Sequence, residues 1–516
     1  MNDIISYLGA HNEIKEVVLK LGAESNAALV CDICSMVKLD RLVICVFTDD
    51  LEKEIRKLLQ KLQNEPDCCV PKTVEWYLRG DICNYHAQTE YMALIIDGLN
   101  TLEAVIEPAV IKPKYLIGVM NRRNINVVRV WERYRQETDH IYIQTWEENH
   151  RTEILNWSKN PNSDIELSII FPVYRVAAYI EKCIRTVTAW KADYVEFLFV
   201  DDESPDESAD IIKKYAKTDH RIVLLQKKNG GCASARQYGL EHAKGRYVGF
   251  VDPDDYVDKT MFHKLFCRAL VGTYEISYCG YQELYEETHM TKEVADVLDL
   301  PYREGTCDRN KIDALIAYRR IAIWRGIYLT DMITRNGIHF YTDIRRFDDL
   351  PFKLETLAVA RSVVAVPEYL YFYRMSRPGQ DVSADDERLY VHFQIFQYLD
   401  RFFASAKEKV QLDYLQVVKI QTHRWALEKI KPEFVDVYCR LAKKDLLANF
   451  PYAEGKYILK RFASKMDLLY YMAICRNHVE IVRMLAAFPD SRHTIRRKQR
   501  QLKKFRELNR KYGKRQ

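Results

Sequence analysis

Short apolar runs alternate with helix-like segments most clearly between residue 164 and about residue 270. The run at 195–200 is almost wholly apolar, which is typical of a strand buried on both faces of a parallel sheet. The segments between the runs carry apolar residues at helical spacing. This alternation predicts repeated β-α-β units, and therefore a doubly wound, mostly parallel α/β sheet. We expect its strands at 167–171, 195–200, 222–225 and 247–251, and its first helix at 178–189.

A second helix is predicted to begin soon after the strand at 195–200. Ser204 can serve as its N-cap, and Pro205 suits the first helical position. Glu207 stands three residues after Ser204 and would complete a capping box with it. The sequence therefore predicts that this helix starts at Pro205.

The regions on either side of this sheet have different patterns. Residues 1–160 predict a smaller α/β domain with neither a G-x-G-x-x-G motif nor a phosphate loop. A diverged nucleotide-binding unit, a docking domain and a second transferase all remain open for this region. Residues 157–163 are polar and contain a proline, as a linker does. The predicted domains are 1–160, 164–383 and a helical C-terminal region, 384–516.

Further elements are predicted inside the two flanking regions. In the first region apolar runs predict strands at 41–47, 91–96, 115–120 and 141–143, with a helix at 51–62. In the last region apolar residues at helical spacing predict helices at 390–403, 410–430 and 466–488.

The composition narrows the class of protein. The chain has 516 residues, of which 48% are apolar and 29% charged, as expected for a globular chain of several domains. No stretch approaches the roughly 20 apolar residues that a membrane-spanning helix needs, and the start lacks the pattern of a secretory signal. Thirteen cysteines without regular spacing fit reduced thiols. We therefore expect a cytoplasmic protein.

The C-terminal tail is strongly basic. Between Ser491 and Gln516 twelve basic residues accompany one acidic residue, Glu507, a net charge of +11 against +5 for the whole chain. The pattern predicts an amphipathic helix with a cationic face. Such a helix would dock on an anionic membrane, as at the inner face of the plasma membrane, or would simply be solvated. No motif supports nucleic-acid binding. The apolar residues between the cations include Leu502, Phe505, Leu508 and Tyr512.

Acidic residues follow two of the predicted strands. Asp201 and Asp202 end the second strand, whereas Asp252, Asp254 and Asp255 follow the fourth. Ligands of open α/β sheets bind at the carboxyl ends of the strands, where these side chains should meet. Carboxylates gathered there repel one another unless a cation compensates them. Oxygen ligands suit Mg²⁺ or Mn²⁺, which in turn bind phosphates. Taken singly, each aspartate fits a helix cap or a turn equally well.

A glycine turn lies between the third and fourth strands. Asn229, Gly230 and Gly231 precede a helical segment that contains Arg236. Glycine lets the backbone approach a ligand closely, and a helix start favours anions. Arg236 would either contact phosphates or neutralise the acidic cluster, and the sequence leaves both roles open.

In order and spacing these motifs resemble the family 2 glycosyltransferases of the GT-A fold, which are inverting enzymes common in bacterial surface-polysaccharide synthesis. Members have Pro-Val-Tyr-Asn, Val-Asp-Asp-Gly-Ser, an Asn-x-Gly to Ala-Arg-Asn segment and Asp-x-Asp-Asp. Here the corresponding stretches are Pro172-Val173-Tyr174-Arg175, Val200-Asp201-Asp202-Glu203-Ser204, 229–237 and Asp252-Pro253-Asp254-Asp255. Downstream, Ile323-Trp324-Arg325, Asp348-Asp349-Leu350-Pro351-Phe352 and Tyr371-Phe372-Tyr373-Arg374 resemble three further family segments.

Four positions depart from the family pattern. Arg175 and Gln237 replace common asparagines, Glu203 replaces a glycine, and Asp348 replaces the glutamate of a Glu-Asp pair. None of these changes removes a carboxylate that the reaction needs. They do leave the preference for donor and acceptor open.

The resemblance implies roles for the matched residues. Asp349 falls where the family places its catalytic base, although a solvated helix start would also explain Asp348 and Asp349. A divalent ion, Mn²⁺ or Mg²⁺, would be held by Asp254 with help from Asp252 or Asp255. The donor would be a nucleoside-diphosphate sugar, with a UDP-sugar favoured, and the acceptor a glycan or a lipid-linked molecule. The residues expected to bind the donor are Pro172, Val173, Tyr174, Asp201, Asp202, Gly230, Arg236, Asp252 and Asp254.

Two other functions are weighed against this one. A nucleotidyltransferase would want a glycine-rich, basic loop after the first strand, where Pro172, Val173 and Tyr174 stand instead. A catalytically inactive relative, serving as a scaffold or a glycan-binding protein, would be expected to lose an aspartate from one of the clusters. Every aspartate is present, so a transferase is favoured.

Overall fold

The computed structural model divides the chain into two compact units. One unit is Met1–Asp164 with Phe266–Tyr274, and the other is Ile165–Leu265 with Glu275–Gln516. None of the helices in the described residues combines the length and apolar character needed to cross a bilayer. The described residues are 7–11, 13–21, 28–46, 49–63, 71, 73–78, 92–97, 115–121, 127–146, 154–285, 290–294, 305–317, 322–375, 384–404 and 409–487.

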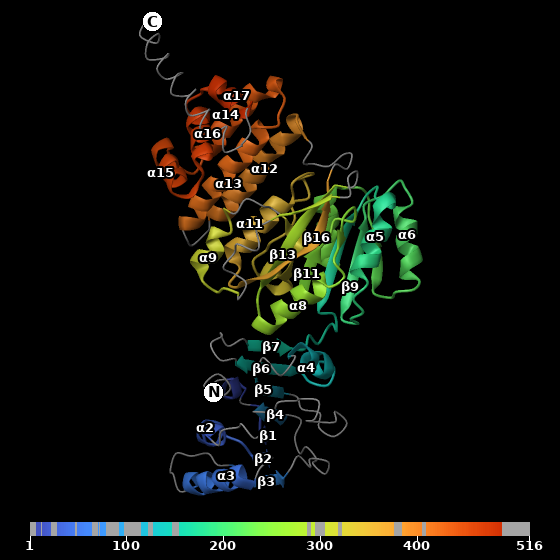
Figure 1. Ribbon diagram of the computed structural model, residues 1–516, viewed down its shortest axis with the longest axis vertical. Helices are drawn as coiled ribbons and strands as arrows, with labels where there is room; N and C mark the ends of the chain where they lie inside the picture. Colours follow the sequence, from blue (N-terminus) through green and yellow to red (C-terminus); the bar gives the residue numbers. More distant parts are fainter. Residues whose placement is uncertain are drawn as a thin grey trace, which may run out of the picture. The chain divides into compact units, whose positions relative to one another are not determined.

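The first unit contains a seven-stranded sheet in the order β3-β2-β1-β4-β5-β6-β7 (Figure 1). All neighbouring strands are parallel except β6 and β7. The order of the first six strands is that of the doubly wound nucleotide-binding sheet. The strands are β1 (Glu16–Leu21), β2 (Arg41–Val46), β3 (Thr73–Leu78), β4 (Met92–Asp97), β5 (Tyr115–Asn121), β6 (His140–Trp146) and β7 (Ile154–Ser158). The helices are α2 (Ala28–Met36), α3 (Asp49–Leu62) and α4 (Val127–Tyr134).

The first part of the predicted linker is a strand. Trp157 and Ser158 belong to β7, and Trp157 is buried edge-to-face against Trp131 with ring centroids 6.1 Å apart. Burial of this large aromatic side chain explains why the start of the predicted linker is ordered as part of an edge strand.

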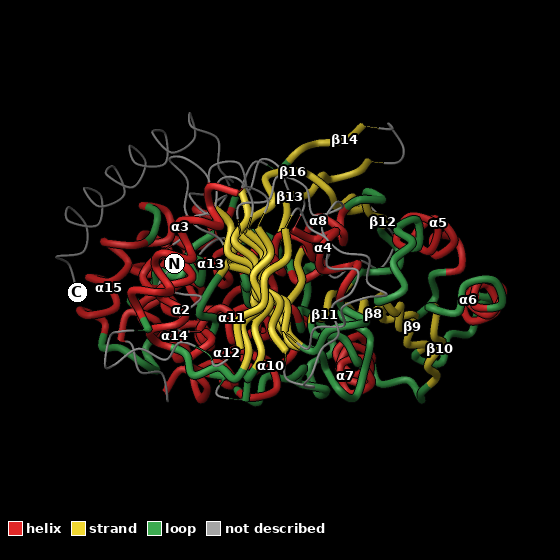
Figure 2. The backbone as a smooth tube through the Cα atoms, turned by 90° about the horizontal axis from the view of Figure 1, so that it is seen from below, coloured by secondary structure: helices red, strands yellow, loops and turns green. Residues whose placement is uncertain are grey.

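The second unit contains a nine-stranded mixed sheet in the order β10-β9-β8-β11-β15-β13-β16-β12, with β14 paired to β13. Strands β10, β9, β8 and β11 are parallel, as predicted, and β15 runs antiparallel to both of its neighbours. Figure 2 shows β13 and β14 extending beyond the rest of the sheet. The strands are β8 (Leu167–Val173), β9 (Val195–Asp201), β10 (Ile222–Gln226), β11 (Tyr247–Phe250), β12 (Tyr256–Val257), β13 (Ile276–Tyr285), β14 (Met290–Glu293), β15 (Gly326–Leu329) and β16 (Val363–Arg374).

Helices α5 (Ala177–Val187), α6 (Ser208–Ala216), α7 (Cys232–His242) and α8 (Met261–Gly272) follow these strands. The predicted capping box at Ser204 is wrong, because α6 begins at Ser208. The backbone N–H of Ser204 donates to Asp201 Oδ1, 3.0 Å away, which ties Ser204 to the end of β9. Asp206 instead accepts from the backbone N–H of Ser208 and from that of Ala177 at the start of α5.

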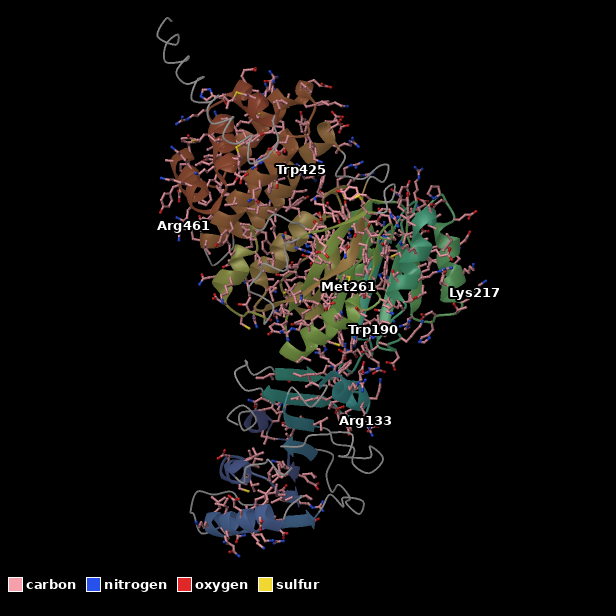
Figure 3. The ribbon with its side chains drawn as sticks, in the orientation of Figure 1. Arg133, Trp190, Lys217, Met261, Trp425 and Arg461 are labelled. Atoms are coloured by element: carbon pink, nitrogen blue, oxygen red, sulfur yellow. The ribbon has the colours of Figure 1, made fainter. Side chains whose placement is uncertain are left out.

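Two of the C-terminal helices share a core with the sheet. Side chains of α11, α12 and α13 pack with those of β8 and β11 in one buried cluster, while side chains of α13, α14, α15, α16 and α17 form a second cluster. Both clusters belong to the second unit, so the helices from residue 384 onward are not a separate compact unit. Figure 3 labels Trp425, which lies in α13. The helices are α9 (Arg309–Ala314), α10 (Thr330–Arg335), α11 (Asp349–Val359), α12 (Val391–Ala404), α13 (Lys409–Leu427), α14 (Val435–Leu446), α15 (Tyr452–Phe462), α16 (Lys465–Cys475) and α17 (Val479–Ala486).

One predicted helix is two helices. The segment 466–488 forms α16 and α17, separated at Asn477, which has the left-handed backbone conformation with φ 59°. Asparagine adopts this conformation at helix ends more readily than most residues do. The basic tail lies outside the described residues, so its predicted helix stays a prediction.

Candidate active site

Parallel pairing brings the carboxyl ends of β8, β9 and β11 to one edge of the sheet. Val173 pairs with Asp201 across β8 and β9, and the backbone N–H of Asp202 donates to Val173 O, 2.9 Å away. Phe250 pairs with Ile170, so the acidic segment 252–255 follows β11 at the same edge. The expected meeting of the two acidic segments at this edge therefore has a direct structural basis.

The carboxylate of Asp202 organises the glycine turn before α7. It accepts hydrogen bonds from the backbone N–H groups of Gly230, at 2.9 Å, and Gly231, at 2.7 Å, and from Lys227 Nζ at 2.8 Å. Gly231 has φ 89°, and a Cβ on Gly230 would come within 2.6 Å of Ser234 Oγ. The turn therefore needs glycine at both positions. Lys227 was not anticipated, although its place just after β10 marks the same edge.

Arg236 joins the acidic segment 252–255 to the acidic pair Asp348 and Asp349. Its guanidinium donates to Asp252 Oδ1 at 2.5 Å and to Asp348 Oδ2 at 2.7 Å, and the side chain is buried. One cation in α7 thus bridges the residue that follows β11 and the residue that precedes α11. Of the two roles left open for Arg236, this arrangement corresponds to neutralising the acidic cluster.

Asp255 is tied into the protein interior. Its Oδ2 accepts from Tyr371 Oη at 2.8 Å, and its Oδ1 accepts from the backbone N–H of Arg374 at 2.7 Å. Burial, with Asp254 and Asp252 nearby, raises the pKa of Asp255 well above its usual range. Because both carboxylate oxygens already serve to attach β16, the structure lends no support to Asp255 as a metal ligand.

Asp348 and Asp349 stand at the start of α11, after Phe347 with φ 57°. Asp348 is only 4% exposed, so the interpretation of this residue as part of a solvated helix start is wrong. Asp349 is partly exposed, but the surrounding protein removes most of the water from its carboxyl group. This desolvation, and then the charge of Asp348, raise the pKa of Asp349 to about 7, while Arg236 acts in the opposite direction. A carboxyl group with this pKa can exchange a proton near neutral pH.

An aromatic group supports the acidic cluster. Trp324 stacks on Tyr371 with ring centroids 4.1 Å apart and on Tyr373 at 5.4 Å, and Tyr281 meets Trp324 edge-on at 4.9 Å. Tyr371 also accepts a long hydrogen bond of 3.3 Å from the backbone N–H of Asp252. The tryptophan and tyrosine segments seen in the sequence therefore meet behind the same cluster.

Four other residues that were predicted to bind the donor lie in or directly after β8 and β9. Val173 is buried, and Tyr174 is 42% exposed beside Arg175, whose guanidinium carbon is 5.3 Å from the Tyr174 ring centroid. Asp201 accepts from Ser204 N–H and from Gln226 Nε2, so it braces the loop that follows β9. Pro172 is the residue between Phe171 and Val173 in β8 and pairs with Val200. Their contact with a nucleoside stays a prediction.

The acidic residues after β11 have the chemistry of divalent-ion ligands. Among the described residues, no group of three or more His, Cys, Asp or Glu side chains is suited to hold a metal ion alone. Asp252 and Asp254 carry hard carboxylate oxygens on the segment after β11, and the Asp252 side chain is 25% exposed. This donor set fits an ion that takes its other ligands from a bound diphosphate or from water.

Comparison with known proteins assigns the family. Residues 168–305 match the family model "Glycosyl transferase family 2". The uncharacterized glycosyltransferase YibD of Escherichia coli (strain K12) is 30% identical over 255 residues, which are 47% of this chain and 74% of YibD. The chain belongs to the family 2 glycosyltransferases.

One further relative and one solved structure are also similar to this chain. The uncharacterized glycosyltransferase EpsJ of Bacillus subtilis (strain 168) is 35% identical over 212 residues, 40% of this chain and 60% of EpsJ. The chain therefore matches only part of the length of such relatives. The S. aureus TarS 1–349 structure in complex with UDP has a TM-score of 0.50 at 16% identity, covering 63% of this chain and 90% of TarS 1–349. The second unit has the GT-A fold that the sequence predicted.

Proposed function

We propose that the protein transfers a sugar from a nucleoside-diphosphate sugar to a hydroxyl group of a glycan or lipid-linked acceptor, with inversion at the anomeric carbon. One observation carries this proposal. The carboxyl group of Asp349, at the start of α11, has a pKa raised to about 7. It is coupled electrostatically to Asp252, which follows β11 at the edge where Asp202 holds the glycine turn. UDP is favoured as the nucleoside diphosphate because the TarS 1–349 structure contains UDP.

Asp349 acts as the base of the proposed reaction. The acceptor hydroxyl gives its proton to the Asp349 carboxylate while its oxygen forms a bond to the anomeric carbon of the donor sugar. The bond from that carbon to the diphosphate oxygen breaks on the opposite face, and the nucleoside diphosphate leaves with the bonding electrons. A single displacement of this kind inverts the configuration at the anomeric carbon.

The donor would lie over the carboxyl ends of β8, β9 and β11. Pro172, Val173 and Tyr174 would border the nucleoside together with Asp201 and Asp202, while Gly230 lets the backbone come close to the donor. Arg236 would hold Asp252 and Asp348 in place rather than bind the phosphates, since its side chain is buried and each terminal nitrogen donates to one of these carboxylates.

A divalent ion, Mn²⁺ or Mg²⁺, would be held by Asp254 with Asp252 and by the diphosphate oxygens. When bound, such an ion neutralises the negative charge that develops on a leaving diphosphate. The protein supplies the two carboxylates on a short segment after β11, and the chain folds back through Arg374, whose Nε donates to Asp254 O at 2.7 Å.

The test compares wild-type protein with Asp349→Asn. UDP release from a panel of UDP-sugars, with Mn²⁺ or Mg²⁺ added, should be lost in the variant, whereas UDP should still raise the melting temperature of both proteins. Wild-type activity should fall as the pH drops below about 7, because protonated Asp349 cannot accept the acceptor's proton. If the wild type neither releases nor binds UDP, the result would favour the alternative of an inactive scaffold or glycan-binding protein.

The basic tail suggests where the reaction takes place. Residues 491–516 lie outside the described residues, and their net charge of +11 would attract them to anionic lipid at the cytoplasmic face of the plasma membrane. A chain that ends at Pro489 should no longer sediment with phosphatidylserine-containing vesicles, whereas the full chain should. Equal sedimentation of the two chains would contradict this proposal.

A further inference from the structure

The second unit contains an open cavity of about 390 Å³. It is bordered by residues 339–343, by Gln237 of α7 and by Tyr398 of α12. The segment 339–343 joins α10 to α11, so it leads directly to Asp348 and Asp349. The volume is within the range of about 300–1,000 Å³ that is usual for small-molecule sites.

Three rings form a ladder along this cavity. Tyr398 stacks on Tyr341 with ring centroids 4.0 Å apart and planes 20° apart, and the His339 ring lies 4.7 Å from Tyr341. Tyr341 Oη donates to Glu355 Oε1, 2.7 Å away on α11, so the ladder is anchored to the helix that starts with Asp349. Fixed aromatic rings offer carbon surface against which the C–H groups of a ligand can pack.

The polar side chains of the cavity are held in defined positions. Asp343 Oδ2 accepts hydrogen bonds from Gln394 Nε2 at 2.7 Å and from Tyr398 Oη at 2.5 Å, while the Asp343 residue as a whole is exposed. Gln237 accepts the backbone N–H of Phe340 at 2.9 Å, which fixes the segment against α7. A carboxylate that is both oriented and open to solvent is a ready acceptor for ligand hydroxyl groups.

We propose that this cavity binds one sugar residue of an oligosaccharide acceptor, at a distance from the hydroxyl group that reacts. The inference rests on the proposed function and deepens it, because it selects an oligosaccharide among the acceptors named there. A sugar has both kinds of group that this lining recognises, C–H faces for the rings and hydroxyls for Asp343. None of the described residues that border the cavity is Lys or Arg, and Asp343 contributes a carboxylate. The guanidinium carbon of Arg401 lies 5.5 Å from the Tyr398 ring centroid, but Arg401 is not among the described lining residues. This lining disfavours a phosphate or nucleotide at this place.

The position of the cavity limits its distance from the catalytic carboxylate. Asp349 stands six positions after Asp343, so even a fully extended chain places the two residues at most about 20–22 Å apart. On α7 the cavity residue Gln237 directly follows Arg236, which binds Asp252 and Asp348. An acceptor chain of several sugars is therefore long enough to reach from the cavity to the catalytic carboxylate.

The experiment uses the full chain, with Asp343→Asn and His339→Ala as two single variants of exposed residues that should fold. Asp331→Asn is the matched control, because Asp331 is also exposed and lies on α10, away from the lining residues. An array of bacterial surface oligosaccharides of increasing length, with their monosaccharides, serves as the probe. We expect the wild type to bind oligosaccharides better than monosaccharides, and both cavity variants to bind them roughly tenfold more weakly.

A second measurement separates this inference from the proposed function. UDP release with water as the acceptor should be the same in the wild type, the cavity variants and the control, because the cavity does not hold the donor. Absence of oligosaccharide binding by the wild type, or equal binding by the cavity variants, would overturn the inference. Absence of UDP release from every protein would instead count against the proposed function.

Discussion

At three positions around the candidate site a residue other than glycine has the left-handed backbone conformation. Arg175 has φ 54°, Glu203 has φ 61° and Phe347 has φ 57°. Each costs about 1–2 kcal/mol relative to an ordinary conformation. Such residues gather at functional sites, where the surrounding structure enforces them. Two of the four departures from the family pattern, Arg175 and Glu203, are thus places where the backbone suits the more common asparagine or glycine.

Replacing Arg175 with asparagine should therefore stabilise the fold. Asparagine tolerates the left-handed region better than arginine does, so Arg175→Asn should raise the free energy of unfolding by roughly 0.5–1 kcal/mol. Denaturant unfolding measures the change. Lys217→Asn is the control, because Lys217 is a lysine at the end of α6 with φ −66°, where no such strain exists. An equal gain in both variants would show that strain at Arg175 is not the cause.

Asp349 should lower stability at neutral pH. Its folded pKa of about 7 lies above the unfolded value near 3.8, so the folded state holds the extra proton between these values. The contribution of Asp349 to the free energy of unfolding therefore falls as the pH rises from about 4 to about 7, and then stays level. Asp349→Asn removes this charge and should raise the melting temperature more at pH 8 than at pH 5. The control is Asp210→Asn, at an exposed position of α6, which should show no such difference between the two pH values. A loss of stability at pH 8 in Asp349→Asn would contradict the expectation.

The sequence predicts which acidic residues belong to the site, but not which side chains they contact. Asp252 and Asp349 follow from motif order. The bridge from Arg236 to Asp348 joins residues 112 positions apart, and no local pattern encodes such a contact. Asp255 was expected to bind a metal because it belongs to an acidic run, whereas its burial under Tyr371 becomes visible only once β16 is paired with β12.

Among the elements, α7 depends on one close approach to the sheet. A Cβ on Gly239 would come within 2.5 Å of Ile170 Cγ2 and 3.2 Å of Val200 Cγ2, from β8 and β9. Gly239→Ala should therefore push α7 outward, cost about 1–3 kcal/mol and shift Arg236 away from Asp252 and Asp348. Denaturant unfolding and UDP release should both show a loss.

A glycine in open space provides the control for this change. A Cβ on Gly9, also in a helix, would meet nothing within 4 Å, so Gly9→Ala should leave stability unchanged or slightly raised. If Gly239→Ala were as stable and active as Gly9→Ala, the close packing of α7 would not matter for the site.

The predicted elements are accurate where the pattern is local. The apolar runs placed β8, β9, β10 and β11 within two residues of their observed ends, because both faces of these strands are covered. Strands β13 and β15 were not predicted, since their antiparallel pairing joins segments about 50 residues apart and is decided by tertiary contacts. The start of α6 was misplaced because Asp201 binds the backbone of Ser204.

On the scale of the whole molecule, the sheet and the C-terminal helices α12 and α13 form one core within the second unit, and α13 to α17 bury a second one. Phe347, just before the acidic pair, lies 4.9 Å from the His392 ring of α12 and 5.7 Å from the Trp425 ring of α13. These helices thus support the left-handed turn that presents Asp348 and Asp349. A boundary at residue 384 was predicted because the chain reads as helical from there onward, but a helical pattern does not reveal which surfaces pack together.

Removing these helices should unfold the second unit. Ile395, Phe396, Leu399, Phe403 and Leu415 are fully buried against it. Burial of each such side chain is worth about 1.5–3 kcal/mol, so together they match the whole stability of a typical domain, about 5–15 kcal/mol. A chain that ends at residue 383 should aggregate or show no cooperative unfolding transition by circular dichroism. A chain that ends at Ala487 keeps all of these contacts and should melt like the full chain. If the chain that ends at residue 383 also melted like the full chain, the helices would be dispensable for the fold.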